Sequence, residues 1–226
     1  MNIENAPEIN GLLRSHMIRL PNEIRDASGI KVFGKKIKSF VFTTDVAIIR
    51  NTNADAVIAV YPFTPQPIIT QSIVNAADIP VFCGVGGGLT SGRRVINLAL
   101  DAEFKGAMGV VVNSPISNEV LKKMRDTIDI PIIVTIISEF EDFESRIKTG
   151  ASILNISGAR NTVAIVKKIR KSYAEFPIIA TGGPDVKSII ETIQAGANAI
   201  IYTPPTASGI MNEIMKKYRT KYQVEN

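Results

Sequence analysis

The chain has 226 residues, of which 45% are hydrophobic and 21% charged, and its formal net charge is +5. This length allows one domain with a large core. The single cysteine excludes an internal disulfide and favours a reducing compartment. No apolar run approaches the roughly 18 residues of a membrane helix, and the polar start of the chain is unlike a signal peptide. We expect a cytoplasmic protein without a membrane partner.

The positive charge is concentrated in three clusters, at residues 35–38, 167–171 and 216–219. The last two lie late in predicted helices, where cations interact favourably with the helix dipole. No basic patch interleaved with aromatic residues accompanies them, so nucleic-acid binding is not expected. A positive field can still attract small anionic substrates.

Residues 1–36 are predicted to form an extension in front of the main domain. A short helix over 21–28 ends at Gly29, and residues 30–37 have the pattern of a small hairpin. We expect this segment to plug one end of the domain, away from the chemistry. The sole histidine, His16, lies in it and is not expected to be catalytic. Apolar residues of the extension hint at a homodimer.

From residue 37 onward, apolar runs of about six residues alternate with helical segments of roughly 10–15 residues. Continuous Val and Ile runs are typical of parallel strands buried on both faces, and the helical segments between them indicate βα units. Eight strands are predicted, at 37–44, 56–62, 80–86, 108–114, 131–138, 152–158, 177–182 and 199–204.

A repeat of roughly 45–50 residues supports this count. Pro precedes the third, fifth and seventh strands, whereas Gly-Ala precedes the fourth, sixth and eighth. Gly ends a helix and Pro starts a strand without needing its N–H. Eight parallel strands of this kind predict an α/β fold, a single (βα)8 TIM barrel over residues 37–226. An open doubly wound sheet is the alternative.

The stretch 178–185 has the pattern of a strand, a glycine turn and a capped helix over 186–194. Gly182 and Gly183 would let backbone N–H groups approach a ligand, and a helix N-terminus carries partial positive charge. The loops after the last two strands of such barrels often bind phosphate. This loop is therefore predicted to hold an anion; a plain strand-to-helix turn is the alternative.

The chemistry of a barrel lies at the carboxyl ends of its strands. Asp45 and Glu139 are the candidate catalytic acid–base groups there, although each is equally suited to a helix start. Cys83 is expected to be a buried structural residue, and no strand-end lysine supports Schiff-base chemistry. The predicted substrate-binding residues are Gly86, Gly87, Asn113, Asn155, Ser157, Thr181, Gly182, Gly183 and Thr203.

Three further features of this face are ambiguous. The glycine-rich loop 84–88 matches neither the dinucleotide fingerprint nor the P-loop. Arg93 and Arg160 have the chemistry to clamp a phosphate or carboxylate, or they are surface helix residues. No ligand spacing indicates a transition metal, and Asp45 with Glu139 would at most help to hold Mg²⁺.

The order of motifs over 79–202 resembles the class I aldolases that cleave 2-keto-3-deoxy-6-phosphogluconate. The parallels are 84–86 with 89–90, 113–115, 150–151 and 177–183. The resemblance implies a (βα)8 barrel with substrate phosphate near Gly182 and Gly183. Asn155 stands in place of the Schiff-base lysine of these aldolases and Ala59 in place of their glutamate, so aldolase chemistry is not expected.

The whole chain also resembles an uncharacterised barrel family of Gram-positive bacteria whose members are usually labelled "hydrolase". The shared motifs lie at 44–47, 56–65, 84–88 and 202–205. This resemblance implies the same fold and adds little about the reaction.

These observations lead to three functional hypotheses. The first is a hydrolase, lyase or isomerase that acts on a small phosphorylated or carboxylated metabolite and needs no cofactor. The second is an FMN-dependent oxidoreductase, because FMN-binding barrels use a similar glycine loop. The third is a non-catalytic barrel that binds a metabolite, which the shortage of titrating residues at the face would explain.

Overall fold

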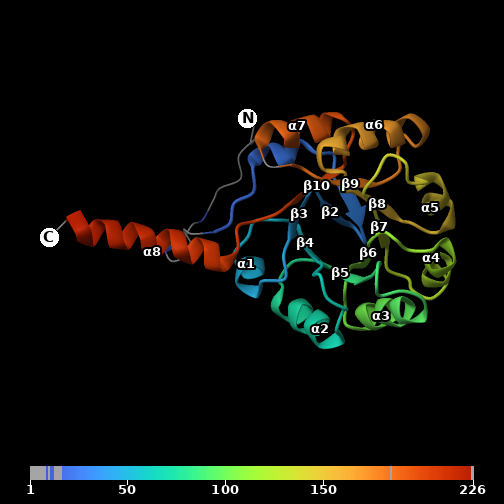
Figure 1. The fold of residues 1–226 in the computed structure, drawn as a ribbon, viewed down its shortest axis with the longest axis horizontal. Coiled ribbons are helices and arrows are strands. Elements are labelled where there is room, and N and C mark those ends of the chain that lie inside the picture. The colour runs from blue at the N-terminus through green and yellow to red at the C-terminus, as the bar shows by residue number, and fades with distance from the viewer. Residues whose placement is uncertain (1–8, 10, 13–16, 184, 225–226) are drawn as a thin grey trace.

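A computed structural model describes residues 9, 11–12, 17–183 and 185–224 of the chain. Eight parallel strands close into a barrel in chain order, with the last strand pairing with the first (Figure 1). This confirms the predicted TIM barrel, and every predicted strand range contains an observed strand. The strands are β3 (Ser39–Phe42), β4 (Ala56–Ala59), β5 (Val81–Gly86), β6 (Gly109–Val112), β7 (Ile132–Ile136), β8 (Ile153–Ile156), β9 (Ile178–Thr181) and β10 (Ala199–Tyr202).

A helix follows each strand, and the first seven surround the barrel (Figure 1). Some are shorter than the predicted 10–15 residues. α1 ends after Arg50 because the chain then turns, and Thr52 pairs with Ile18 of the N-terminal segment. The helices are α1 (Val46–Arg50), α2 (Pro67–Ala76), α3 (Arg93–Phe104), α4 (Asn118–Arg125), α5 (Phe143–Thr149), α6 (Thr162–Ser172), α7 (Val186–Gln194) and α8 (Ala207–Val224).

The barrel has two hydrophobic cores, because successive strand residues point to opposite faces. Side chains between strands and helices form the larger, outer core. The inner core fills the barrel, and there Phe40 and Phe82 pack edge to face with ring centroids 5.3 Å apart. Strands that are buried on both sides explain the continuous apolar runs in the sequence.

The predicted hairpin is present as β1 (Ile30–Val32) and β2 (Lys35–Ile37), which pair antiparallel. Its buried side chains Ile30, Val32 and Ile37 belong to the inner core, so the hairpin closes the amino-terminal end of the barrel. The helix expected over 21–28 is a shorter 3₁₀ helix, η2 (Asn22–Asp26). Pro21 caps its start, and the chain leaves it for the hairpin at Ala27. His16 lies outside the described residues.

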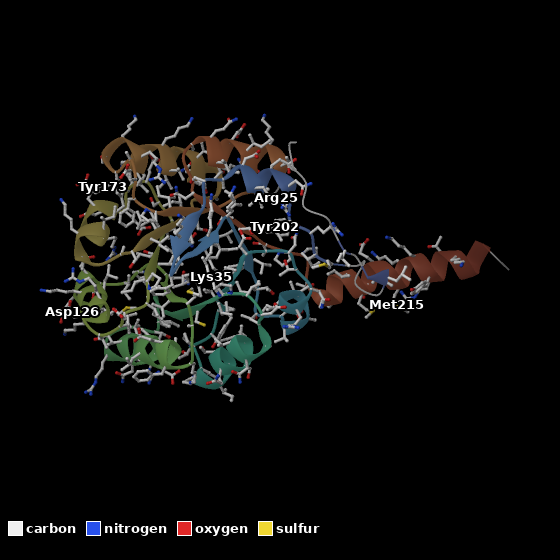
Figure 2. All side chains as sticks on the ribbon, turned by 180° about the vertical axis from the view of Figure 1, so that it is seen from behind. Arg25, Lys35, Asp126, Tyr173, Tyr202 and Met215 are labelled. Carbon is white, nitrogen blue, oxygen red and sulfur yellow. The ribbon has the colours of Figure 1, made fainter. Side chains whose placement is uncertain are left out.

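The last helix is arranged differently from the others. α8 projects away from the barrel beyond Tyr202, and Figure 2 shows Met215 well clear of the barrel wall (Figures 1 and 2). Within the part of the chain that the structure describes, no helix is long and apolar enough to cross a membrane.

Candidate functional site

Three neighbouring strands carry a chain of polar side chains at their carboxyl ends. The Asn155 amide nitrogen Nδ2, on β8, donates to Thr135 Oγ1 on β7 at 3.2 Å. That hydroxyl donates to Asn113 Oδ1, just after β6, at 3.0 Å. All three occupy inward-facing positions, because their strand neighbours Val112, Leu154 and others belong to the outer core. The sequence therefore places a polar layer directly above the inner apolar core.

At the Asn155 end of this hydrogen-bonded series, one oxygen lacks a hydrogen-bond partner. Asn155 is 8% exposed, and its Oδ1 is the one buried side-chain N or O atom without a hydrogen-bond partner among the described residues. Leaving a buried acceptor unpaired costs about 1–3 kcal/mol. Such a cost is unusual in a stable core and calls for an explanation, of which a ligand-dependent role is one.

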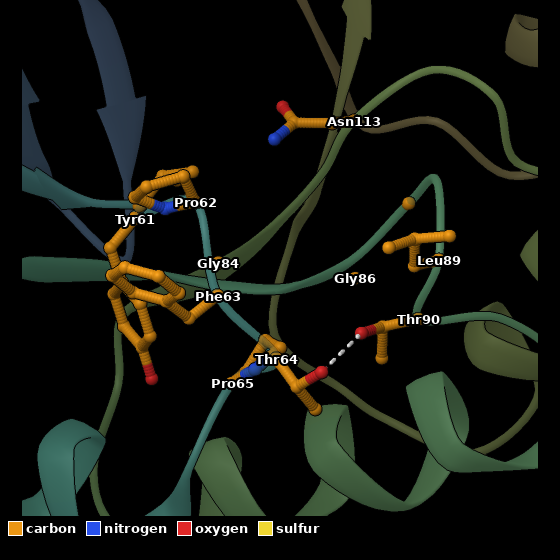
Figure 3. A pocket seen from close by; sticks show the side chains of 12 residues that line it. Tyr61, Pro62, Phe63, Thr64, Pro65, Gly84, Gly86, Leu89, Thr90 and Asn113 are labelled. Atoms are coloured by element: carbon orange, nitrogen blue, oxygen red, sulfur yellow. Dashed lines mark hydrogen bonds between the residues drawn. The ribbon is translucent and has the colours of Figure 1, made fainter.

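At the other end of the series, Asn113 lines a cavity of about 200 Å³ between the β4–α2 and β5–α3 loops (Figure 3). Thr90 and Thr64 close one side, with their hydroxyl oxygens 3.5 Å apart. None of the lining residues has a carboxylate or a basic side chain. They are Val60, Tyr61, Pro62, Phe63, Thr64, Pro65, Gly84, Gly86, Gly87, Leu89, Thr90 and Asn113.

The glycines of the β5–α3 loop are explained by close backbone contact. Gly87 has φ +111°, and a Cβ there would lie 2.2 Å from the carbonyl oxygen of Asn113. A side chain at position 87 would therefore push the β5–α3 loop away from Asn113 at the end of β6. β5 also shifts its register against β6 between Gly84 and Gly86. The loop shapes the cavity through its backbone.

The two predicted catalytic carboxylates lie outside this cavity. Asp45 caps α1, where its Oδ1 accepts from the N–H groups of Ala47 at 2.8 Å and Ile48 at 3.3 Å. Glu139 is half-buried in the β7–α5 loop, and Lys168 Nζ donates to its backbone oxygen at 2.6 Å. Neither contact tests whether these groups act on a substrate, so their catalytic role stays a prediction.

A third carboxylate, Glu141, is tied to the strand end beside Asn113. Its Oε1 accepts from the N–H of Ile137 at 2.8 Å, and its Oε2 accepts from Ser114 Oγ at 3.3 Å. Glu141 and Thr135 were missed as site residues. Thr135 had a signal, because it is the polar residue at an inward position of an otherwise apolar strand, whereas Glu141 is one of several acids in its loop.

In the β9–α7 loop, the Gly182 N–H and the start of α7, both predicted to hold an anion, have partners within the protein. The N–H of Gly182 donates to Ile201 O at 3.3 Å. Asp185 and Ser188 form a capping box, with Ser188 N donating to Asp185 Oδ1 at 2.8 Å. These hydrogen bonds from Ser188 lower the pKa of Asp185. The Asp185 carboxylate therefore already occupies the start of α7. Pro184 lies outside the described residues.

The predicted substrate-binding residues thus fall into two groups. Gly86, Gly87 and Asn113 line the cavity, and Asn155 is joined to it through Thr135. The second group lies at the ends of β8, β9 and β10 and does not line this cavity: Ser157, Thr181, Gly182, Gly183 and Thr203.

The remaining polar candidates are easily placed. Arg93 begins α3 and Arg160 lies in a short 3₁₀ helix, η3 (Ala159–Asn161), and both are exposed. Cys83 is buried in the outer core, where desolvation raises the pKa of its thiol to about 12. This confirms that Cys83 is a buried residue, as expected. Among the described residues, no group of three or more His, Cys, Asp or Glu side chains is placed to hold a metal ion.

Comparison with known proteins reveals the fold alone. No protein-family model and no curated protein matches the chain. Solved structures that resemble it include a 2,3-dimethylmalate lyase of the PEP mutase/isocitrate lyase superfamily, with TM-score 0.63 and 13% identity over 89% of this chain and 85% of that one. A dihydrodipicolinate synthase from Bacillus anthracis gives 0.59 and 15% over 83% and 76%. A mandelate oxidase variant with an FMN adduct gives 0.60 and 14% over 78% and 68%.

These similarities agree with an aldolase-like barrel, as expected from the sequence motifs. The identities are too low to carry an activity over to this chain. The resemblance to an uncharacterised barrel family gains no support from a family model and stays a prediction.

Proposed function

We propose that this chain is a barrel enzyme of the hydrolase, lyase or isomerase type, acting on a small phosphorylated or carboxylated metabolite at the carboxyl end of the barrel. One observation carries the proposal: the cavity at that end is joined, through Asn113 and Thr135, to the unsatisfied buried oxygen of Asn155. Barrel enzymes bind their substrates at this face.

The neutral part of the substrate would bind in the cavity. Asn113 Oδ1 accepts from Thr135, which leaves its amide nitrogen for a carbonyl oxygen of the substrate. Figure 3 shows the Asn113 side chain directed from its strand toward the β4–α2 loop. A hydroxyl or amide group that reached Asn155 Oδ1 would supply its missing donor. A carboxylate oxygen could not pair with Asn155 Oδ1, because both atoms only accept hydrogen bonds.

The anionic end of the substrate would bind at the start of α3. This helix begins three residues after Thr90 of the cavity, and its N-cap Gly92 makes no side-chain cap. Its first two residues are Arg93 and Arg94, and its first turn contains no acid. Cations at a helix N-terminus oppose the helix dipole. A bound phosphate or carboxylate would satisfy both the arginines and the free N–H groups.

Asp45 and Glu139 remain the proposed general bases, and Glu141 would position the strand end beside Asn113. The test of the bases is an Asp45→Asn/Glu139→Gln double variant. We expect turnover to fall at least a hundredfold, the usual contribution of general acid–base catalysis. Unchanged turnover in the double variant would reject both residues as bases.

The first experiment is a search for ligands by thermal unfolding. Small phosphorylated and carboxylated metabolites are added at constant ionic strength, and those that raise the melting temperature are assayed for turnover. A site filled to 100 times its Kd adds about 2.7 kcal/mol. Asn113→Leu should weaken the effect, whereas Asn75→Leu, on exposed α2, should keep it in full. A ligand that stabilises both variants equally binds elsewhere.

FMN has less support as a cofactor. Its phosphate would need donors in the β9–α7 loop, but the Gly182 N–H is paired with Ile201 and the Asp185 carboxylate stands at the start of α7. These residues do not fit a dianionic phosphate. Absorbance near 450 nm in the purified protein would restore the oxidoreductase hypothesis. Saturable binding without turnover of any ligand would favour the non-catalytic one.

A further inference from the structure

The helix α8 has 18 residues, and none of the side chains that the structure describes on it is fully buried. Only Ala207 and Ile210, in its first turn, pack against the barrel core. The rest projects into solvent for most of a length of about 27 Å (Figures 1 and 2). A single helix of this size is marginally stable in water and usually needs a packed apolar face.

α8 has no place on its own barrel. The N-terminal segment 17–27 occupies the wall between α1 and α7, which flank the strands β3 and β10. Ile18 donates to Asn51 O after α1 at 2.7 Å, and η2 packs against α7 with Ile24 only 2% exposed. An eighth helix folded back against β10 would collide with this segment.

The apolar residues of α8 have the spacing of a coiled-coil seam. Ala207, Met211, Ile214 and Tyr218 are separated by four, three and four residues, so they form one stripe along the helix. Met211 is 57% exposed and Tyr218 is 56% exposed. Lys216 and Thr220 lie on the opposite side of the helix. A narrow seam of this kind fits another helix better than a flat surface.

We propose that α8 pairs antiparallel with α8 of a second copy of this chain, making the protein a symmetric dimer. In this pairing Met211 faces Ile214 of the second copy. Ala207, which is only partly buried against its own barrel, faces Tyr218, and the twofold axis forms each of these two layers twice. The smallest seam residue thus meets the largest. A twofold pair uses the same surface on both subunits and therefore closes without forming a filament.

Charge also permits this pairing. The flanking positions place Ile210 beside Lys217 of the second copy and Ser208 beside Met215, so no two cations meet along the seam. Lys216 and Arg219 point away from it. The lysine stem can cover apolar surface while its ammonium group stays in water.

The mass of the full chain in solution tests the dimer. Light scattering should give twice the monomer mass of 24.5 kDa for the unmodified protein. Ile214→Glu places a charge in the seam and should give the monomer mass. Thr220→Glu adds the same charge on the opposite side and should leave the dimer intact. A concentration-independent monomer for the unmodified chain would overturn the proposal.

The register is tested by mixing variants. Because Met211 faces Ile214, the M211K and I214E chains should each be monomeric and should form a mixed dimer when combined, with one apolar layer and one ion pair. The I214E chain mixed with a Y218K chain should stay monomeric, since Tyr218 faces Ala207. Failure of the first mixture with a dimeric unmodified chain would overturn this pairing. Sedimentation of the unmodified, monomeric chain with phosphatidylserine vesicles would assign α8 to a membrane surface.

Discussion

Two glycine loops end strands at the same face of the barrel, yet they serve different purposes. In the β5–α3 loop, Gly87 lets the backbone lie against Asn113, and α3 starts with arginines and no side-chain cap. In the β9–α7 loop, the Asp185–Ser188 capping box satisfies the start of α7 from within. The residues that follow the glycines therefore decide whether a helix start is free for a ligand.

The largest expected effect is that of Gly87→Ala. The new Cβ would lie 2.2 Å from a backbone oxygen, in a conformation with φ +111°. Strain and overpacking together should lower the free energy of unfolding by about 3 kcal/mol or more. Urea denaturation measures this change.

Gly88→Ala is the matched control. Gly88 has φ +66°, but a Cβ there would meet nothing within 4 Å. Its cost should be that of a left-handed alanine alone, about 1 kcal/mol. Equal losses in the two variants would mean that the contact with Asn113 is not what requires glycine at position 87.

The second prediction separates the two loops as anion sites. Saturating phosphate should stabilise the protein by about 2.7 kcal/mol at 100 times its Kd, with ionic strength matched by chloride. For this size of domain the melting temperature should rise roughly 5–10 °C. Arg93→Ala/Arg94→Ala should remove the shift, whereas Gly183→Asp should keep it.

The charge-matched control is Lys167→Ala/Lys171→Ala, which removes two exposed cations from α6. It should behave like the unmodified chain. Loss of the phosphate shift in Gly183→Asp, with retention in the arginine variant, would instead place the anion in the β9–α7 loop, as the sequence predicted.

Much of the fold could be predicted because the relevant signals are local. Apolar runs rich in Val and Ile predicted all eight strands, with Pro or Gly-Ala before the last six, and the hairpin followed from residues 30–37. The course of α8 could not be predicted in this way. It depends on the segment 17–27 occupying the barrel wall, where η2 packs against α7 from the other end of the sequence.

The candidate site was only partly predictable for the same reason. The sequence identified Asn113 and Asn155 as strand-end amides, but not that Thr135 joins them by hydrogen bonds. The glycine pair at 182–183 resembles a phosphate loop in sequence. The Gly182 N–H is already paired with Ile201 of the neighbouring strand, a contact that only the folded barrel brings about.

The third prediction tests whether Asn155 is kept for function rather than stability. Asn155→Leu replaces the unsatisfied oxygen by an apolar group of similar shape. Removal of the unpaired Asn155 Oδ1 should stabilise the protein more than loss of the hydrogen bond to Thr135 destabilises it. The free energy of unfolding should therefore rise by about 1 kcal/mol. Any ligand response or turnover should be lost. Destabilisation by this variant would mean that Asn155 Oδ1 has a partner in solution.

The smallest expected effect concerns the capping box of α7. Hydrogen bonds from Ser188 lower the pKa of Asp185, so its contribution to stability is complete above the ordinary aspartate pKa, about 3.9, and is lost as the pH falls through the lower value of the folded state. The stability difference between the unmodified chain and Asp185→Ala should therefore be constant from pH 7 to about pH 4 and shrink toward pH 2. Ser188→Ala removes one donor and should move this loss to higher pH. A difference that grows on acidification would mean that folding raises the pKa of Asp185, which contradicts a carboxylate stabilised by the helix start, and would reopen the β9–α7 loop as a ligand site.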